Sequence, residues 1–175
     1  EELAPGGAIA MIEDGCLEGV DEIYGAHLWS PLTLGTVQYL AGPIMASADR
    51  FEIKVQGKGG HGAEPHETID AVVVAAQFVT QLQTIVARTV DPLQSAVISI
   101  GNFEAKNPFN VIADDVNMLG TVRTFNEDVR QMVKEKIEQH LAGVCTAYDA
   151  TYDYNYVEGY PPVVNHDEQT EVVAQ

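Results

Sequence analysis

Apolar and polar residues alternate in the middle of the chain, which is the pattern of a strand with one buried face. Phe51, Ile53 and Val55 take the apolar positions, and charged or amide side chains stand between them. Residues 68–90 follow after a glycine-rich connection, and they are rich in Ala, Val and Gln and contain no Gly or Pro. This composition predicts a long helix with a broad apolar face, which Pro92 ends.

The pattern continues through further strands and a second helix. Alternation predicts strands over 95–103, 115–125 and 150–157. Before the last of these, the polar opening at Asn126 and apolar residues at helical spacing predict a helix that ends near Gly143. The order strand, helix, strand, strand, helix, strand predicts an α+β domain of the ferredoxin-like type, with a four-stranded antiparallel sheet and both helices on one face. Because the other face or an edge strand is left without cover, we expect this domain to form a dimer.

Both flanking segments lie outside this unit. Residues 1–46 are rich in Gly and Pro and carry short apolar runs, which predict a helical turn at Ala8–Ile12 and a buried strand at Glu22–Leu28. We interpret 47–160 as a domain inserted into a second domain, to which 1–46 and 161–175 belong. We also expect that only part of this second domain is present in the sequence.

Composition narrows the class of protein. The chain has 26 acidic and 9 basic residues and a formal net charge of -17, so its overall field repels nucleic acid and anionic membranes. No apolar run approaches the roughly 20 residues that span a bilayer, and no segment resembles a signal peptide, so we expect a cytoplasmic protein. Cys16 and Cys145 lack CxxC spacing and have apolar neighbours, and we expect both to be buried free thiols.

Glycines surround one histidine directly after the first predicted strand. The sequence from Gly57 to His66 places His61 among glycines, which let a loop expose an imidazole and approach another backbone closely. Pro65 suits the first turn of a following helix. An ordinary strand-to-helix connection that happens to hold histidines remains the alternative. In the same way His27, at the end of the predicted strand, is either a structural histidine or a site residue at a sheet edge.

Taken together, the motifs of this chain resemble a known family. The segments that carry the resemblance are Glu1-Glu2, Pro5-Gly6-Gly7-Ala8, Gly25-Ala26-His27-Leu28-Trp29, Gly35-Thr36-Val37, Gly59-Gly60-His61-Gly62-Ala63-Glu64-Pro65-His66, Asn110-Val111-Ile112, Gly120-Thr121-Val122-Arg123-Thr124-Phe125 and Gly159-Tyr160-Pro161-Pro162. Over nearly its whole length the chain is similar to metal-dependent amidohydrolases of the hippurate hydrolase and N-acyl-amino-acid aminoacylase type, a group that includes plant auxin-conjugate hydrolases. In that family a ferredoxin-like lid, which also forms the dimer, interrupts a catalytic domain with a dinuclear metal centre.

The resemblance implies roles for residues of the first segment. Glu1 matches the carboxylate that acts as the general base, and Glu2 and His27 match metal ligands. Carboxylate and imidazole ligands suit two divalent ions of zinc, manganese, cobalt or nickel. The family's remaining ligands, an upstream cysteine and histidine and a histidine near the far C-terminus, have no match here. We therefore expect the 175-residue chain alone to be inactive, and the reaction to belong to a longer parent protein.

The resemblance also implies roles for residues of the lid. His61 matches the histidine that reaches the partner subunit's active site and holds the developing oxyanion, and Asn110 matches a residue beside the scissile amide. Arg123 matches the group that binds the substrate carboxylate, although a cross-strand salt bridge is an alternative use of this side chain. The expected substrate is an N-acyl amino acid, and the expected assembly is a homodimer.

Other interpretations account for part of the same sequence. A non-catalytic ferredoxin-like module for dimerisation or binding explains 48–160 but leaves Glu1, Glu2 and His27 without a role. A related carboxypeptidase or deacetylase is a further alternative, because the lid alone does not determine the preferred acyl group.

Overall fold

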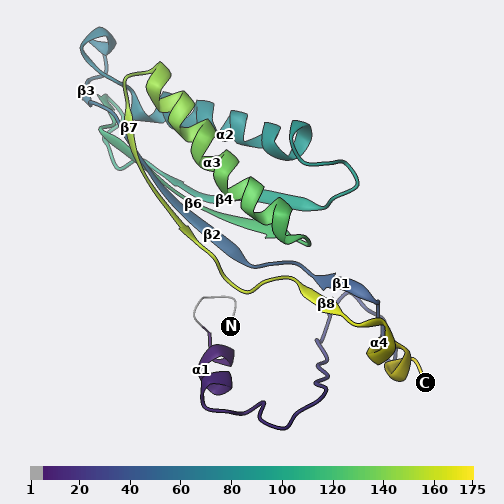
Figure 1. Cartoon of the computed structure of the whole chain (residues 1–175). Coiled ribbons are helices and arrows are strands. Elements are labelled where there is room, and N and C mark those ends of the chain that lie inside the picture. The colour runs from purple at the N-terminus through teal and green to yellow at the C-terminus, as the bar shows by residue number, and fades with distance from the viewer. Residues whose placement is uncertain (1–5) are drawn as a thin grey trace.

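A sheet covered by two long helices forms one part of the fold, and a narrow ribbon with the flanking segments forms the other (Figure 1). The computed structural model describes residues 6–175. The helices are α1 (Ala8–Glu13), the 3-10 helix η1 (Pro65–Glu67), α2 (Ala71–Arg88), α3 (Glu127–Ala147) and α4 (Asp167–Val173). The strands are β1 (Gly42–Met45), β2 (Asp49–Gln56), β3 (Gly60–His61), β4 (Ala96–Glu104), β5 (Val111–Ile112), β6 (Asp115–Thr124), β7 (Thr151–Val157) and β8 (Val163–Asn165).

The main sheet has four strands in the order β4-β6-β2-β7, and every neighbouring pair is antiparallel. In Figure 1, α2 and α3 lie side by side on one face of this sheet. The predicted ferredoxin-like α+β fold is therefore confirmed. Both central strands follow the predicted alternation, because β2 and β6 turn every second side chain toward the helices.

The hydrophobic core lies between this sheet and the two helices. Its fully buried side chains include Phe51, Ile53 and Val55 of β2, Val116, Met118 and Val122 of β6, Phe78, Leu82 and Ile85 of α2, and Val133, Ile137 and Leu141 of α3. By length and composition α2 could cross a membrane. Its buried side packs in the core, however, so its apolar character serves the packing of the domain.

The helix ends differ from the prediction by about one turn. Helix α2 begins at Ala71 rather than at residue 68, because the Asp70 carboxylate accepts hydrogen bonds from the backbone N–H groups of Val72 and Val73 and caps the helix there. Asn126 caps α3 as predicted, but the helix continues past Gly143 to Ala147. One glycine inside a helix costs only about 1 kcal/mol relative to alanine, and the burial of the following turn outweighs that cost.

The flanking segments form few regular elements. The predicted helical turn at Ala8–Ile12 is confirmed by α1, and β1 pairs with β8 in an antiparallel ribbon that leads into the sheet. The predicted buried strand at Glu22–Leu28 is wrong, because these residues form no strand and Leu28 is 95% exposed. An apolar run becomes a strand only where a neighbour satisfies its backbone groups, and within 6–175 no strand lies beside it.

The expectation of two buried thiols is half correct. Cys145 is buried in the core, and this burial raises the pKa of its thiol. Cys16 is exposed. It follows α1, a short helix without buried residues, so its apolar sequence neighbours do not form a core around it.

Candidate functional site

The glycine-rich loop lies at the tip of the sheet, at the end far from the ribbon of β1 and β8 (Figure 1). Strand β3 pairs with β5 in an antiparallel register that sets His61 opposite Val111. The backbone N–H of Gly62 donates to the carbonyl of Asn110 at 2.9 Å. The fold therefore brings His61 of β3 close to Asn110, which is far away in sequence and directly precedes β5.

Close backbone contact explains two of the glycines. A Cβ atom at Gly59 would lie 2.6 Å from the carbonyl oxygen of Ile112, and one at Gly62 would lie 2.8 Å from that of Asn110. Real Cβ atoms do not approach backbone oxygens so closely, so any other residue would separate the loop from β5. These glycines hold His61 against the 110–112 segment, and His61 itself stays exposed.

One hydrogen bond determines which nitrogen of His61 carries the proton. The backbone N–H of Ala63 donates to Nδ1 of His61 at 3.1 Å. Because an N–H group can only donate, Nδ1 is the acceptor, and the proton of the neutral ring is on Nε2. His61 thus offers an Nε2–H donor at the tip of the domain. A donor of this kind can stabilise negative charge on an oxygen atom.

Asp114 fastens the start of the same loop, and our sequence analysis missed it. Its Oδ1 accepts a hydrogen bond from the N–H of Gly59 at 2.8 Å. Its carbonyl oxygen accepts bonds from the N–H of Gly57 at 2.7 Å and from Nε2 of Gln56 at 3.0 Å. The sequence feature that could have drawn attention to Asp114 is its position directly before β6. The first residue of β6, Asp115, pairs in register with the last residue of β2.

Arg123 lies at the other end of β6 from this loop. It is separated from Asp115 by eight residue steps, which span roughly 27 Å of extended strand. Its guanidinium donates to the carbonyls of Asp49 and Val122 and contacts the hydroxyl of Thr121. The structure therefore does not bring Arg123 together with His61 within one chain.

His27 lies in the segment before β1 and has the opposite tautomer. Its Nδ1 is 2.6 Å from the carbonyl oxygen of Leu28, and its ring meets that of Trp29 edge to face at 5.5 Å. Because a carbonyl oxygen can only accept, Nδ1 carries the proton and Nε2 keeps its lone pair. That is the state a metal-binding histidine needs, with its second nitrogen held by a backbone carbonyl.

A complete metal site is not found in the part of the chain that the structure describes. Among residues 6–175, no group of three or more His, Cys, Asp or Glu side chains lies close enough to hold an ion. The candidates Glu1 and Glu2 fall outside the described residues. His27 has the chemistry of one ligand, and a zinc-type site needs three or four.

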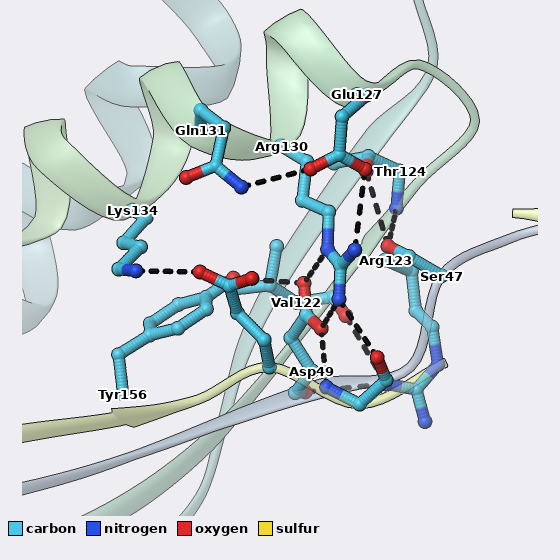
Figure 2. A network of polar contacts seen from close by, with 12 residues as sticks. Ser47, Asp49, Val122, Arg123, Thr124, Glu127, Arg130, Gln131, Lys134 and Tyr156 are labelled. Carbon is cyan, nitrogen blue, oxygen red and sulfur yellow. Dashed lines mark hydrogen bonds and ion pairs between the residues drawn. The ribbon is translucent and has the colours of Figure 1, made fainter. Parts of the chain in front are cut away.

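A buried ion pair forms a second polar cluster at the base of the sheet (Figure 2). The Asp49 carboxylate, fully buried on the helix-facing side of β2, accepts hydrogen bonds from Nε and Nη2 of Arg130 at 2.8 and 2.6 Å. It also accepts bonds from the Gly159 N–H at 2.9 Å and the Tyr156 hydroxyl at 3.0 Å. Arg130 in turn donates to the carbonyl of Gly159 and to Glu127.

Hydrogen bonds within this cluster keep the buried Asp49 carboxyl group ionised. Burial by itself would raise the pKa of Asp49, but the hydrogen bonds from Arg130 and Gly159 hold that pKa below its ordinary value. The pKa of Arg130 is raised by its bond to Asp49, and the pKa of Tyr156 is raised by burial and by the same carboxylate. The cluster joins α3, β2 and the end of β7, so we assign it a structural role.

Comparison with known proteins places this domain in a family. Residues 47–149 match the family described as the peptidase dimerisation domain of M20 enzymes. The chain belongs to the M20 peptidase family. The match covers β2, β4 and β6 of the main sheet, both long helices and the loop that carries His61, and it stops before β7.

M20 relatives match the chain well beyond the dimerisation domain. The N-acyl-L-amino acid amidohydrolase of Geobacillus stearothermophilus is 49% identical over 168 residues, which are 96% of this chain and 45% of that protein. The N-acetyl-L-cysteine deacetylase of Bacillus subtilis is 40% identical over 172 residues, which are 98% of this chain and 41% of that protein. The chain thus spans less than half the length of these relatives.

Solved structures of M20-like proteins show the same arrangement. A crystal structure from methicillin-resistant Staphylococcus aureus superposes with a TM-score of 0.92 at 41% identity, over 99% of this chain and 46% of that one. YxeP of Bacillus subtilis, described as a dinuclear metal-binding peptidase of the M20 family, superposes with a TM-score of 0.76 at 34% identity, over 97% of this chain and 42% of its own.

Proposed function

We propose that the full-length protein is a metal-dependent amidohydrolase that cleaves the amide bond of N-acyl amino acids. Membership of the M20 family supports a hydrolase, and the names of its relatives support amides of amino acids as substrates. Two divalent ions, when bound, would polarise the amide carbonyl and activate water. The dinuclear description of YxeP supports such a centre, and zinc, manganese, cobalt and nickel remain the proposed ions.

The observation that carries the proposal is the position and tautomer of His61. Its Nε2–H is an exposed donor at the tip of the lid, close to Asn110 and far from the segment that holds His27 (Figure 1). In our proposal this N–H donates to the oxygen that gains negative charge as the amide is attacked, and Asn110 lies beside the scissile group. Because the lid tip lies far from its own flanking segments, we infer that His61 serves the active site of a partner subunit in a homodimer.

In the same proposal the other site residues take the roles that their family matches imply. Glu1 would take the proton from water and return it to the leaving amine, and Glu2 and Nε2 of His27 would hold metal. Arg123 would bind the carboxylate of the substrate. An N-acyl amino acid is far shorter than the roughly 27 Å of β6 that separates Arg123 from the loop. A single site would therefore combine Arg123 of one subunit with His61 of the other.

The experiment that tests this arrangement mixes two inactive full-length variants. His61→Ala and Glu1→Gln are each assayed with N-acetyl and N-benzoyl amino acids in the presence of manganese or zinc, and are then unfolded together and refolded. If His61 acts in the partner's site, each mixed dimer has one complete site. The mixture should then regain about a quarter of wild-type activity, because half of the dimers are mixed and half of their sites are complete.

Each result of this experiment supports or contradicts a specific statement. If the wild-type protein is active but the mixture stays inactive, His61 does not act in trans. If the wild-type protein hydrolyses none of these amides, the N-acyl amino acid proposal fails, and a non-catalytic dimerisation module replaces it. Metal content of His61→Ala should equal that of the wild type, because His61 is not a proposed ligand. The cytoplasmic location, and the exclusion of nucleic acid and membranes as partners, stay predictions from composition.

A further inference from the structure

Asp114 is the residue that ties the histidine loop to the sheet. We propose that Asp114 is a positioning residue for His61, holding the loop through its carboxylate and its carbonyl so that the Nε2–H of His61 is presented to the substrate. This inference rests on the proposed function, because it concerns how the donor of that reaction is kept in place.

The bonds made by Asp114 fix the loop on the side that leads into His61. Oδ1 holds the N–H of Gly59, two residues before the histidine, and the carbonyl holds the N–H of Gly57. On the far side of His61, the N–H of Gly62 is held by the carbonyl of Asn110. The histidine backbone is therefore anchored on both sides by the short segment 110–114, and Lys58 is held in addition by two backbone hydrogen bonds with Ile69.

This anchoring has a direct effect on the ring. The Ala63 N–H reaches Nδ1 of His61 only when the backbone turns at Gly62 and the ring adopts one orientation. If Gly59 is released, the loop loses one of the bonds that hold it against the 110–114 segment, and we expect the His61 ring to be held less well in the orientation that the Ala63 N–H requires. A displacement of about 1 Å in a positioning group can reduce a reaction rate by about a hundredfold.

Asp114 is a positioning residue in this proposal rather than a catalytic one. Its side chain and its carbonyl bind residues 56–59 of the same chain, and neither of them binds His61 itself. The neighbouring carboxylate offers a matched control. Asp115 contacts Nζ of Lys54 at 3.3 Å and the amide of Asn117, both on the sheet rather than on the loop.

The first test compares three variants of the full-length protein: Asp114→Ala, Asp114→Asn and Asp115→Ala. We expect Asp114→Ala to lower kcat about 10- to 100-fold with little change in KM or metal content. Asp114→Asn keeps an oxygen that can accept the Gly59 N–H, so it should recover most of kcat. Asp115→Ala should keep wild-type kinetics. If Asp114→Ala keeps wild-type kcat, or Asp114→Asn is as impaired as Asp114→Ala, the proposal is overturned.

The second test asks whether Asp114 acts through His61. In a protein that already lacks the imidazole, a positioning residue has nothing left to position. The double variant His61→Ala/Asp114→Ala should therefore have the same residual kcat as His61→Ala alone. Multiplied losses would show that Asp114 acts elsewhere and would overturn the proposal.

Mixed dimers provide a third readout, which a general loss of folding would not mimic. When Asp114→Ala is refolded with Glu1→Gln, the mixture should regain activity, as the mixture with His61→Ala does. In each mixed dimer, the subunit with Asp114→Ala supplies an intact Glu1, and the subunit with Glu1→Gln supplies an intact loop to that site. Refolded with His61→Ala, Asp114→Ala should regain none. The opposite pattern would place Asp114 with the metal-binding half of the site. Inactivity of the wild-type protein toward every amide would instead refute the proposed function.

Discussion

Removing the guanidinium of Arg130 should destabilise the lid more than removing any exposed charge on the same helix. The side chain of Arg130 is 6% exposed and that of its partner Asp49 is fully buried. In an Arg130→Ala variant, the Asp49 carboxylate keeps the hydrogen bonds from Gly159 and Tyr156 but loses its countercharge. Breaking a buried ion pair by removing one partner costs about 3–5 kcal/mol. Because two donors to Asp49 remain, we expect the free energy of unfolding of the lid to fall by about 3 kcal/mol, at the lower end of that range.

Lys134, one turn further along α3, supplies the control for Arg130. Its Nζ contacts a carboxylate oxygen of Glu158 at 2.5 Å, but both side chains are more than a third exposed. Exposed ion pairs contribute about 0–1 kcal/mol, so Lys134→Ala should cost no more than about 1 kcal/mol. Both residues belong to the same helix, so differences in helix propensity largely cancel.

Amide hydrogen exchange in the full-length protein measures these effects locally. Peptides that cover β2 and β7 report the free energy of opening of the lid without unfolding the rest of the protein. The expected result is faster exchange in Arg130→Ala than in Lys134→Ala by about a hundredfold, which corresponds to a difference of about 2–3 kcal/mol. Equal exchange in the two variants would refute the reasoning, because it would mean that the buried pair contributes no more than an exposed one.

Two further predictions concern the same cluster and the loop. The folded-state pKa of Asp49 lies below its ordinary value of 3.8, so the stabilisation by this group is fully present above that pH and is lost as the pH falls through the lowered value. Asp49→Asn should abolish this acid-dependent part of lid opening, as hydrogen exchange at low pH will measure, and an unchanged acid dependence would contradict the assignment. Gly62→Ala should push the loop away from Asn110 and lower kcat as severely as His61→Ala, while exchange in β2 stays at the wild-type rate. Wild-type kcat in Gly62→Ala would show that the contact between β3 and β5 is not needed.

Local sequence patterns were sufficient for the main sheet because its strands satisfy each other within the chain. The alternation of Phe51, Ile53 and Val55 predicted the buried face of β2, and the order of elements predicted how the strands pair. The same type of argument failed at Glu22–Leu28, because an apolar run alone does not determine whether a neighbouring strand lies beside it. Periodicity identifies the face that a segment can bury but not the element that covers it.

The polar residues that sequence reasoning missed depend on contacts between distant segments. Asp49 continues the alternating buried stripe of β2, and Arg130 lies three residues before Val133 on the buried side of α3. The sequence could have indicated this pair, because it places opposite charges on two stripes that are otherwise apolar, and a buried charge needs a partner. Asp114 carried a weaker signal, because its importance comes from backbone groups of Gly57 and Gly59 that no sequence motif displays.

The two candidate histidines differ in a way that only hydrogen bonding reveals. Both are exposed imidazoles in the same chain, but His27 donates from Nδ1 to a carbonyl and His61 accepts at Nδ1 from an N–H. His27 therefore keeps a lone pair on Nε2, which suits a cation, whereas His61 keeps a proton on Nε2, which suits an anion. An exchange of their roles would require the loss of a backbone hydrogen bond at each ring. The proposed division between a metal ligand in the segment before β1 and an oxyanion donor at the lid tip thus follows from the local backbone. This division agrees with the proposed homodimer, since the lid tip and the segment that holds His27 lie far apart in one chain (Figure 1).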